Sequence, residues 1–87
     1  MFRMWLKQVK SGKIVKELTY SHPEETNRTA KIFKGLEEAC GAWELAIPIW
    51  LPANIEEFKR HARCRFSQDN FIESIAFDYM EIQVIEE

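Results

Sequence analysis

The first twenty residues alternate between apolar and polar side chains, as two paired strands do. Residues 2–10 and 14–20 predict strands, and Ser11-Gly12 between them predicts the turn of a β-hairpin. One face of this hairpin carries the apolar residues expected in the core: Phe2, Met4, Leu6, Ile14, Leu18 and Tyr20. The opposite face carries Trp5, Val9 and Val15 among charged and polar residues.

The sequence leaves the register of this hairpin open. A loop of residues 11–13 sets Leu6 opposite Leu18. A loop of residues 10–12 places glycine where a positive φ is usually needed, but it sets Leu6 opposite Lys16. Both registers keep the same core face, so the predicted set of buried residues does not depend on the choice.

Residues 21–43 predict the first helix. Residues 21–24 match the S-x-x-E capping box, with a proline that the first turn tolerates. Apolar and small residues then recur at helical spacing and form one stripe: Thr29, Phe33, Leu36, Cys40 and Trp43. We expect this stripe to face the sheet.

Residues 45–52 contain two prolines and cannot form a regular helix. We expect a buried, extended connector anchored by Trp50. Asn54 and the two acids that follow it predict a second helix over residues 55–64. Its inner face carries Ile55, Phe58 and Ala62, and residues 67–70 are typical of a turn.

The last segment, residues 71–86, predicts a long strand whose apolar positions change parity. Ile75, Phe77 and Tyr79 share one parity, whereas Met80, Ile82 and Val84 share the other. A β-bulge at Tyr79-Met80 would place all six residues on one face. Without the bulge, both faces of the strand would have to be covered, and the sequence leaves both possibilities open.

Charge is segregated along the chain of 87 residues, which has 12 Lys+Arg, 14 Asp+Glu and a net charge of −2. Residues 1–16 hold five bases and no acid, and residues 66–87 hold six acids and no base. Opposite charges pair across neighbouring strands, so we expect the last strand to lie beside the N-terminal hairpin. The predicted fold is one α+β domain over residues 1–87, in the order ββααβ. It has a three-stranded antiparallel sheet with both helices packed on one face.

Composition excludes several classes of protein. The length supports one domain, and no apolar run approaches the roughly 20 residues of a membrane span. The first ten residues interleave charged with apolar side chains, so we expect no signal peptide and no membrane association. Two cysteines are too few for a disulfide scaffold, and we therefore expect a cytoplasmic setting.

Few side chains in this sequence point to catalysis or to a cofactor. Cys40, His61 and Cys64 could bind zinc only with His22 as a fourth ligand, and their spacing differs from known zinc sites. The sequence does not tell whether they lie near one another. It holds no glycine-rich phosphate loop, and its neighbouring carboxylates are typical of helix ends. We expect no metal, no cofactor and no enzymatic activity.

The leading hypothesis is a non-enzymatic protein-interaction domain, either a homodimer or an accessory subunit. A face of the sheet without helices would expose Trp5, Val9 and Val15, and apolar patches of this kind mark interfaces. Sheet edges offer a second route to association. The predicted interface is therefore the helix-free face or an edge of the sheet.

Nucleic-acid binding through the basic second helix is the alternative. Its basic patch would consist of Lys59, Arg60, Arg63 and Arg65, which would contact phosphates. Phe58 and Phe66 would supply rings for base stacking. The acidic pI of about 5.7 argues against a dedicated nucleic-acid binder, so this reading ranks second.

Three sequence blocks carry a resemblance to known proteins: GLEEAC (35–40), PIWLPANIEEF (48–58) and RFSQDNFIESIAFDYMEIQVIEE (65–87). These blocks resemble small uncharacterised proteins from anaerobic Firmicutes. The resemblance covers most of the chain and implies a bacterial, cytoplasmic setting. That group has no assigned activity, so the resemblance implies no catalytic or binding residue.

Overall fold

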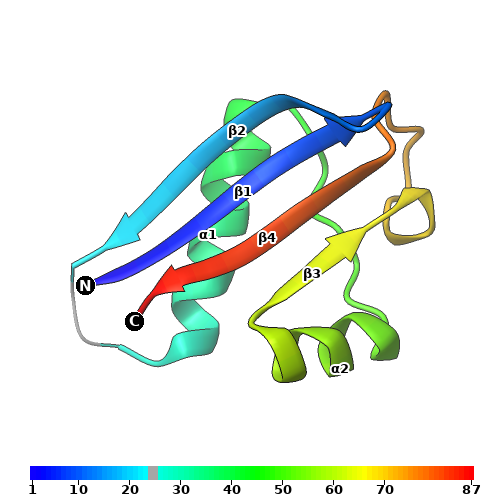
Figure 1. Cartoon of the computed structure of the whole chain (residues 1–87). Helices are drawn as coiled ribbons and strands as arrows, with labels where there is room; N and C mark the ends of the chain where they lie inside the picture. Colours follow the sequence, from blue (N-terminus) through cyan, green and yellow to red (C-terminus); the bar gives the residue numbers. More distant parts are fainter. Residues whose placement is uncertain (24–25) are drawn as a thin grey trace.

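The computed structural model describes residues 1–23 and 26–87 and shows a four-stranded sheet with two α-helices (Figure 1). The elements are β1 (Phe2–Lys10), β2 (Lys13–His22), α1 (Arg28–Ala42), α2 (Pro52–His61), β3 (Arg63–Phe66), the 3-10 helix η1 (Gln68–Asn70) and β4 (Tyr79–Glu86). The strands pair antiparallel in the order β2-β1-β4-β3. The α+β class and the antiparallel sheet are confirmed, but the expected three-stranded sheet is wrong.

The additional strand, β3, lies where the sequence predicted the end of the second helix. That helix was expected over residues 55–64, but α2 begins at Pro52, because proline fits the first helical turn. It ends at His61, and the C-cap residue Ala62 adopts a left-handed φ of 55° and turns the chain directly into β3. Within β3, Cys64 and Phe66 are buried and the alternating residues Arg63 and Arg65 are exposed, which is the period of two expected of a strand.

The β1–β2 hairpin follows the first predicted register away from the turn and neither predicted register next to it. Its loop has two residues, Ser11-Gly12, with φ angles of 53° and 76° that match the twist of the flanking strands. Leu6 faces Leu18, as the first register predicted, but Val9 faces Ile14 because one residue of β2 bulges between these pairs. The bulge removes Ile14 from the core face, and its side chain is 44% exposed.

The predicted long strand over residues 71–86 is wrong in both of the forms left open, with or without a bulge at Tyr79-Met80, because β4 begins at Tyr79 and residues 71–78 form no strand. The apolar residues change from odd to even positions at Tyr79-Met80 because the strand begins there. Met80 and Ile82 are fully buried on the core face of β4. The strand pairs with β1 along most of its length, which confirms the position expected from the segregated charges.

The first helix begins at Arg28, later than expected, because β2 continues through His22. Asn27 caps it, and the Asn27 Oδ1 accepts a hydrogen bond of 2.8 Å from the N–H of Ala30. Glu24, the acid of the predicted capping box, lies outside the described residues. The buried face of α1 is also rotated from the predicted stripe and consists of Ile32, Gly35, Leu36, Ala39 and Cys40.

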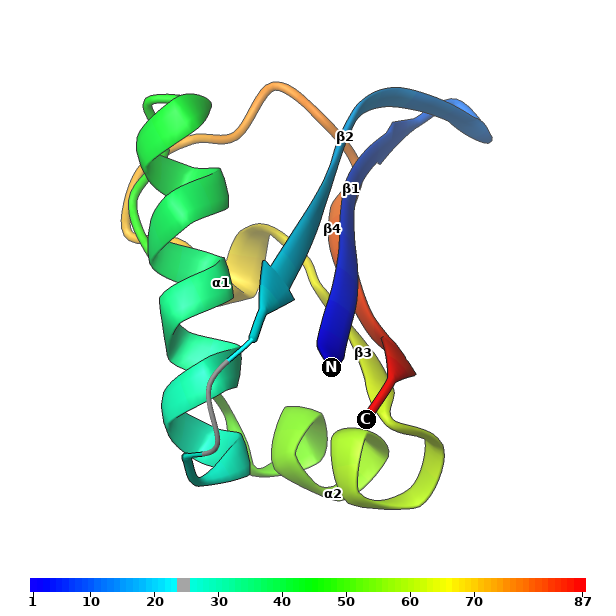
Figure 2. The same cartoon turned by 90° about the vertical axis from the view of Figure 1, so that its left-hand side faces the viewer.

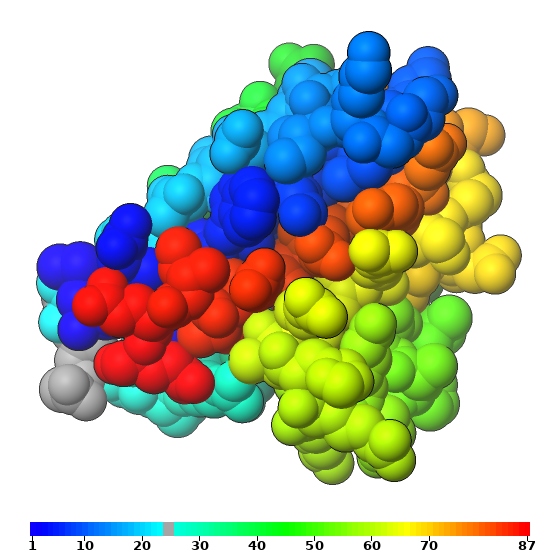
Figure 3. Space-filling model, in the orientation of Figure 1, coloured from blue at the N-terminus to red at the C-terminus, as the bar shows by residue number. Residues whose placement is uncertain are grey.

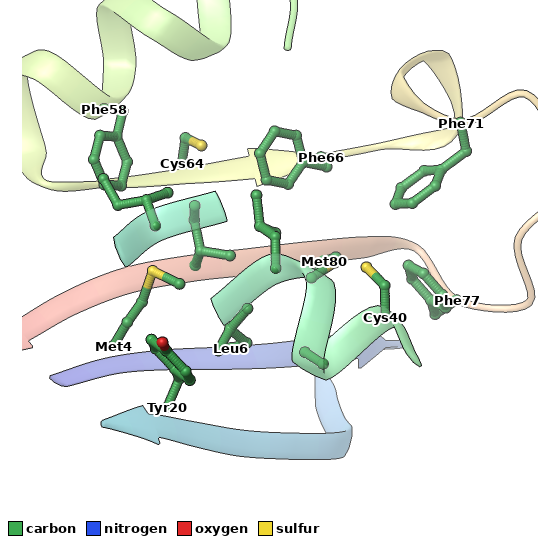
Figure 4. Packing of buried hydrophobic residues seen from close by; sticks show 14 of the residues in the cluster. Met4, Leu6, Tyr20, Cys40, Phe58, Cys64, Phe66, Phe71, Phe77 and Met80 are labelled. Carbon is green, nitrogen blue, oxygen red and sulfur yellow. The ribbon is translucent and has the colours of Figure 1, made fainter. Parts of the chain in front are cut away.

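One hydrophobic core lies between the sheet and the helices (Figure 4). Gly35 lets α1 approach β1 and β2 closely, because a Cβ at this position would lie 2.5 Å from the Met4 Cε and 3.0 Å from the Tyr20 ring. Figure 2 shows α1 on one side of the sheet and α2 beneath it, beside β3. Neither helix covers the opposite face, which we call the helix-free face.

Candidate binding surfaces

Figure 3 shows the molecule from the side of the helix-free face, with β2, β1, β4 and β3 lying side by side. This face carries charged and aromatic side chains that contact one another. Glu81 in β4 lies between two cations: its carboxylate oxygens are 2.9 Å from the Lys7 Nζ and 3.0 Å from the Arg65 Nε. The Lys7 Nζ also lies 4.2 Å from the centre of the Trp5 ring, and the Arg65 Cζ lies 4.4 Å from the centre of the Tyr79 ring. The polar groups of this face therefore satisfy one another.

The buried carboxylate of Glu81 is stabilised in its charged form. Burial by itself raises the pKa of Glu81, but the hydrogen bonds from Lys7 and Arg65, together with their positive charges, outweigh this effect. The pKa of Glu81 consequently lies below its ordinary value. At neutral pH this residue holds β1, β4 and β3 together as a fixed negative charge.

The three residues predicted to form an interface do not form one exposed apolar patch. Trp5 is half-buried, and its Nε1 donates a hydrogen bond of 3.0 Å to Glu17. Val9 is buried, whereas Val15 is 51% exposed in the bulged part of β2. Their role in an interface stays a prediction, and Val15 is the residue most accessible to a partner.

The β3 edge of the sheet is closed by side chains of α2. The Asn54 Nδ2 donates a hydrogen bond of 2.9 Å to the carbonyl of Arg65, and the N–H of Arg65 donates one of 3.2 Å to Glu57. The buried Asn54 Oδ1 in turn accepts hydrogen bonds from the N–H of Leu51 and from the Asn70 side chain. The backbone N–H and carbonyl of Arg65 are thus both satisfied by α2, so the middle of this short edge is covered against another strand.

The β2 edge is open over a longer stretch. Across residues 13–19, no described group outside β1 forms a hydrogen bond with the β2 backbone. The side chains of Ile14 and Val15 are exposed here, as are those of Lys13 and Lys16. Neither lysine has an acidic partner within 4.0 Å in the described part of the chain. The edge therefore presents free backbone groups, apolar side chains and unpaired positive charge together.

The predicted basic patch is exposed, but its expected aromatic partners are not. Lys59 and Arg60 lie on α2, and Arg63 and Arg65 lie on the adjoining β3. Arg65 is already paired with Glu81. Phe58 and Phe66, which the nucleic-acid hypothesis required for base stacking, are buried in the core. The four cations therefore lie on adjoining elements, but the two buried rings are not accessible for base stacking.

A pocket of about 250 Å³ lies on the helix side of the molecule, between α1, the connector and α2. The residues that line it are Thr29, Ile32, Phe33, Trp50, Ile55 and Phe58. Phe33 and Ile55 are 41% and 42% exposed, whereas the sequence analysis placed both in the core. The Arg28 Cζ lies 5.2 Å from the centre of the ring of Phe58, which is one of the lining residues.

The connector was expected to be buried throughout, and this expectation is wrong. Ile47, Ile49 and Leu51 are exposed, whereas Pro48 is buried and Trp50 packs edge-on against aromatic rings of the core. Residues 47–51 of the sequence are all apolar, so no alternation of apolar and polar residues indicated which side of this segment faces solvent.

The two cysteines are buried among apolar residues. Burial raises the pKa of Cys40 to about 11. Burial, together with the charges of Glu57 and Glu81, raises the pKa of Cys64 to about 12. Because the thiolate is the nucleophile and the metal ligand, neither thiol is activated. Among the residues that the structure describes, no group of three His, Cys, Asp or Glu side chains could hold a metal ion.

Comparison with known proteins found no matching family model, curated protein or solved structure. The resemblance to proteins of anaerobic Firmicutes, and the cytoplasmic setting that it implies, therefore stay predictions. Over the described residues, the structure holds no helix with the length and apolar character needed to cross a membrane.

Proposed function

We propose that this protein is a non-enzymatic interaction domain that binds an extended segment of a partner protein along the open edge of β2. One observation carries the proposal: Asn54 and Glu57 cover the β3 edge at Arg65, whereas no described group covers the β2 backbone in this way over residues 13–19. Native proteins usually protect a long sheet edge, so an open one is a candidate for strand addition.

Strand addition uses two kinds of contact. Backbone hydrogen bonds to the edge supply affinity, and side chains at alternate positions supply selectivity. In β2 the exposed Ile14 and Val15 offer apolar contacts, and Lys13 and Lys16 offer charges that have no acidic partner in the described part of the chain. The matching partner is an extended segment in which acidic and apolar residues alternate.

The lysines also decide between the two forms of association expected from the sequence. Two copies paired through this part of β2 would bring the Lys13 and Lys16 side chains of both copies together. Like charges on neighbouring strands are destabilising. An accessory subunit that binds a different, acidic partner is therefore favoured over a homodimer.

A charge-swap experiment tests the proposal. A blocked synthetic peptide of alternating Glu and Val is titrated into the ¹⁵N-labelled protein, beside a matched peptide of alternating Lys and Val. We expect amide shifts centred on residues 13–19 with the acidic peptide. The double variant Lys13→Glu/Lys16→Glu should prefer the basic peptide, with each preference about fivefold.

The matched control is Lys59→Glu/Arg60→Glu, which makes the same change of charge on α2, away from β2. This variant should keep the preference for the acidic peptide. Shifts that avoid β2, or a preference that both double variants reverse equally, would show that the edge is not the docking site.

The helix-free face is a weaker proposal for protein binding, because its polar groups already satisfy one another. Nucleic-acid binding is the second candidate. It is favoured by Lys59, Arg60 and Arg63, none of which has an acidic partner within 4.0 Å among the described residues. Retention on heparin at low salt that disappears in a Lys59→Ala/Arg60→Ala/Arg63→Ala variant would support it. No retention at low salt would remove it.

A further inference from the structure

We infer that the pocket between α1 and α2 binds a small amphiphilic carboxylate, with the apolar chain or ring in the pocket and the carboxylate on Arg28. This site lies on the helix side of the molecule and does not depend on strand addition at β2. The inference rests on an apolar pocket of limited size and on a cation that lies over the ring of Phe58, one of its lining residues.

The size and lining of the pocket define the apolar part of the ligand. Its volume of about 250 Å³ is below the roughly 300–1,000 Å³ of pockets for drug-sized molecules, so it suits one alkyl chain or one ring. Of the six lining residues, five are apolar or aromatic, and Thr29 adds a hydroxyl. Trp50, in the wall, packs edge-on against Phe58 and Phe66 with ring centres 5.6 and 5.0 Å apart. The wall is therefore held in place before a ligand arrives.

Arg28 determines the charged part of the ligand. Its guanidinium lies over the ring of Phe58, which belongs to the pocket wall. Its Nε is 3.0 Å from a carboxylate oxygen of Glu87, and both side chains are about half exposed, at 43% and 54%. Exposed ion pairs of this kind contribute little free energy, so another carboxylate can replace Glu87 at small cost. Glu87 shows that the guanidinium is accessible to a carboxylate.

The apolar pocket and the Arg28 guanidinium lie close together, and this arrangement determines the class of ligand. The Arg28 Cζ is 5.2 Å from the centre of the Phe58 ring, so a carboxylate on Arg28 and an apolar group in the pocket must be joined through a few atoms. Medium-chain fatty acids and aryl carboxylates have this form. A neutral alcohol would leave Arg28 with Glu87, and an amine would be repelled by Arg28.

The experiment compares octanoate with octan-1-ol, which share a chain and differ in the head group. Binding is followed by ¹H–¹⁵N NMR at the indole N–H of Trp50, assigned with a Trp50→Phe variant. Among the described residues this buried indole has no hydrogen-bond partner, so its resonance reports changes in its surroundings. We expect saturable shifts with octanoate, and an affinity for octan-1-ol about threefold to fivefold lower.

Three variants and one control separate the contributions of Arg28, Glu87 and the pocket wall to binding. Arg28→Gln should reduce octanoate affinity to that of octan-1-ol, whereas Glu87→Gln should increase octanoate affinity by removing the internal competitor. Phe33→Ser/Ile55→Ser should weaken both ligands, and the exposure of both side chains makes this variant compatible with folding. Lys34→Gln removes one positive charge elsewhere on α1 and should change neither affinity.

Three results would overturn the inference. Equal affinity of the wild type for octanoate and octan-1-ol would show that the carboxylate is not recognised. A preference that persists in Arg28→Gln would assign recognition to another group. If octanoate causes no saturable shift, but an acidic amphipathic peptide does, the pocket docks a protein segment and the proposed ligand class is wrong.

Discussion

The two edge strands of the sheet, β3 and β2, protect their outward-facing backbone groups from pairing with other strands in different ways. At β3, Asn54 and Glu57 bind the outward carbonyl and N–H of Arg65. At β2, residues 13–19 have no such partners among the described groups, and the strand carries exposed lysines and a bulge. One edge is closed by a neighbouring helix, and the other is protected only against strands that share its charge.

This difference shows that an exposed edge can be selective as well as protected. Lysines and bulges disfavour pairing between identical strands, but the same lysines attract an acidic strand. The closed edge, in contrast, depends on a buried polar network in which Asn54 and Asn70 bind each other and the backbone around them. Substitutions at the closed edge should therefore affect stability, and those at the open edge should affect binding.

The largest expected effect is at the centre of the closed edge. Asn54→Ala removes hydrogen bonds to Leu51, Arg65 and Asn70 and leaves buried groups without partners. We expect the free energy of unfolding to fall by about 3 kcal/mol. Urea denaturation followed by circular dichroism measures this change, and a loss below about 1 kcal/mol would contradict a buried network.

Glu81→Gln should have the next largest effect, because Glu81 connects Lys7 in β1 with Arg65 in β3. The substitution keeps the size of the side chain but weakens two charge-assisted hydrogen bonds. We expect a loss of about 1.5 kcal/mol at pH 7 by urea denaturation. An unchanged midpoint would show that the two ion pairs do not stabilise the fold.

The same carboxylate predicts a loss of stability in acid. The pKa of Glu81 is lower in the folded protein than its ordinary value of 4.5, so its contribution is present above that pH. The contribution disappears as the pH falls through the lower, folded-state pKa. Urea midpoints of the wild type and Glu81→Gln should therefore converge as the pH is lowered below about 4.5. A constant difference between the two proteins would contradict this assignment.

Glu57→Ala should have a smaller effect, because the hydrogen bond that it removes is at the surface. We expect a loss of about 0.5–1 kcal/mol and faster hydrogen exchange at the amide of Arg65. Glu56→Ala is the matched control, since its exposed side chain lies next to Glu57 on α2. Equal exchange rates at Arg65 in both variants would show that Glu57 does not close the edge.

Lys16→Glu at the open edge should have the smallest effect on stability, within about 0.5 kcal/mol. Its side chain is exposed and has no ion-pair partner among the described residues. Thermal unfolding should show the wild-type midpoint. A marked destabilisation would mean that this lysine contributes to the fold, and it would weaken the contrast between the edges.

Sequence patterns predicted the elements whose residues repeat with one period and face one core. The hairpin, its core residues Phe2, Met4 and Leu6, and the position of β4 beside β1 are confirmed. The helix boundaries were shifted, because β2 continues past the expected capping box and Pro52 begins α2 early. β3 was missed because a strand of four residues that follows a helix directly leaves too few positions for a period to show.

The sequence by itself determined the class of fold and the pairing of oppositely charged ends, because periodicity and charge act locally or between neighbouring strands. The tertiary structure alone decided which surfaces stay accessible. In the folded protein Val9 is buried, whereas Phe33 and Ile55 are exposed. One edge of the sheet is covered by Asn54 of α2, whose side chain bonds to the carbonyl of Arg65, eleven residues later in the chain. Accessibility depends on how separate elements pack together, and no local pattern encodes which neighbour covers which side chain.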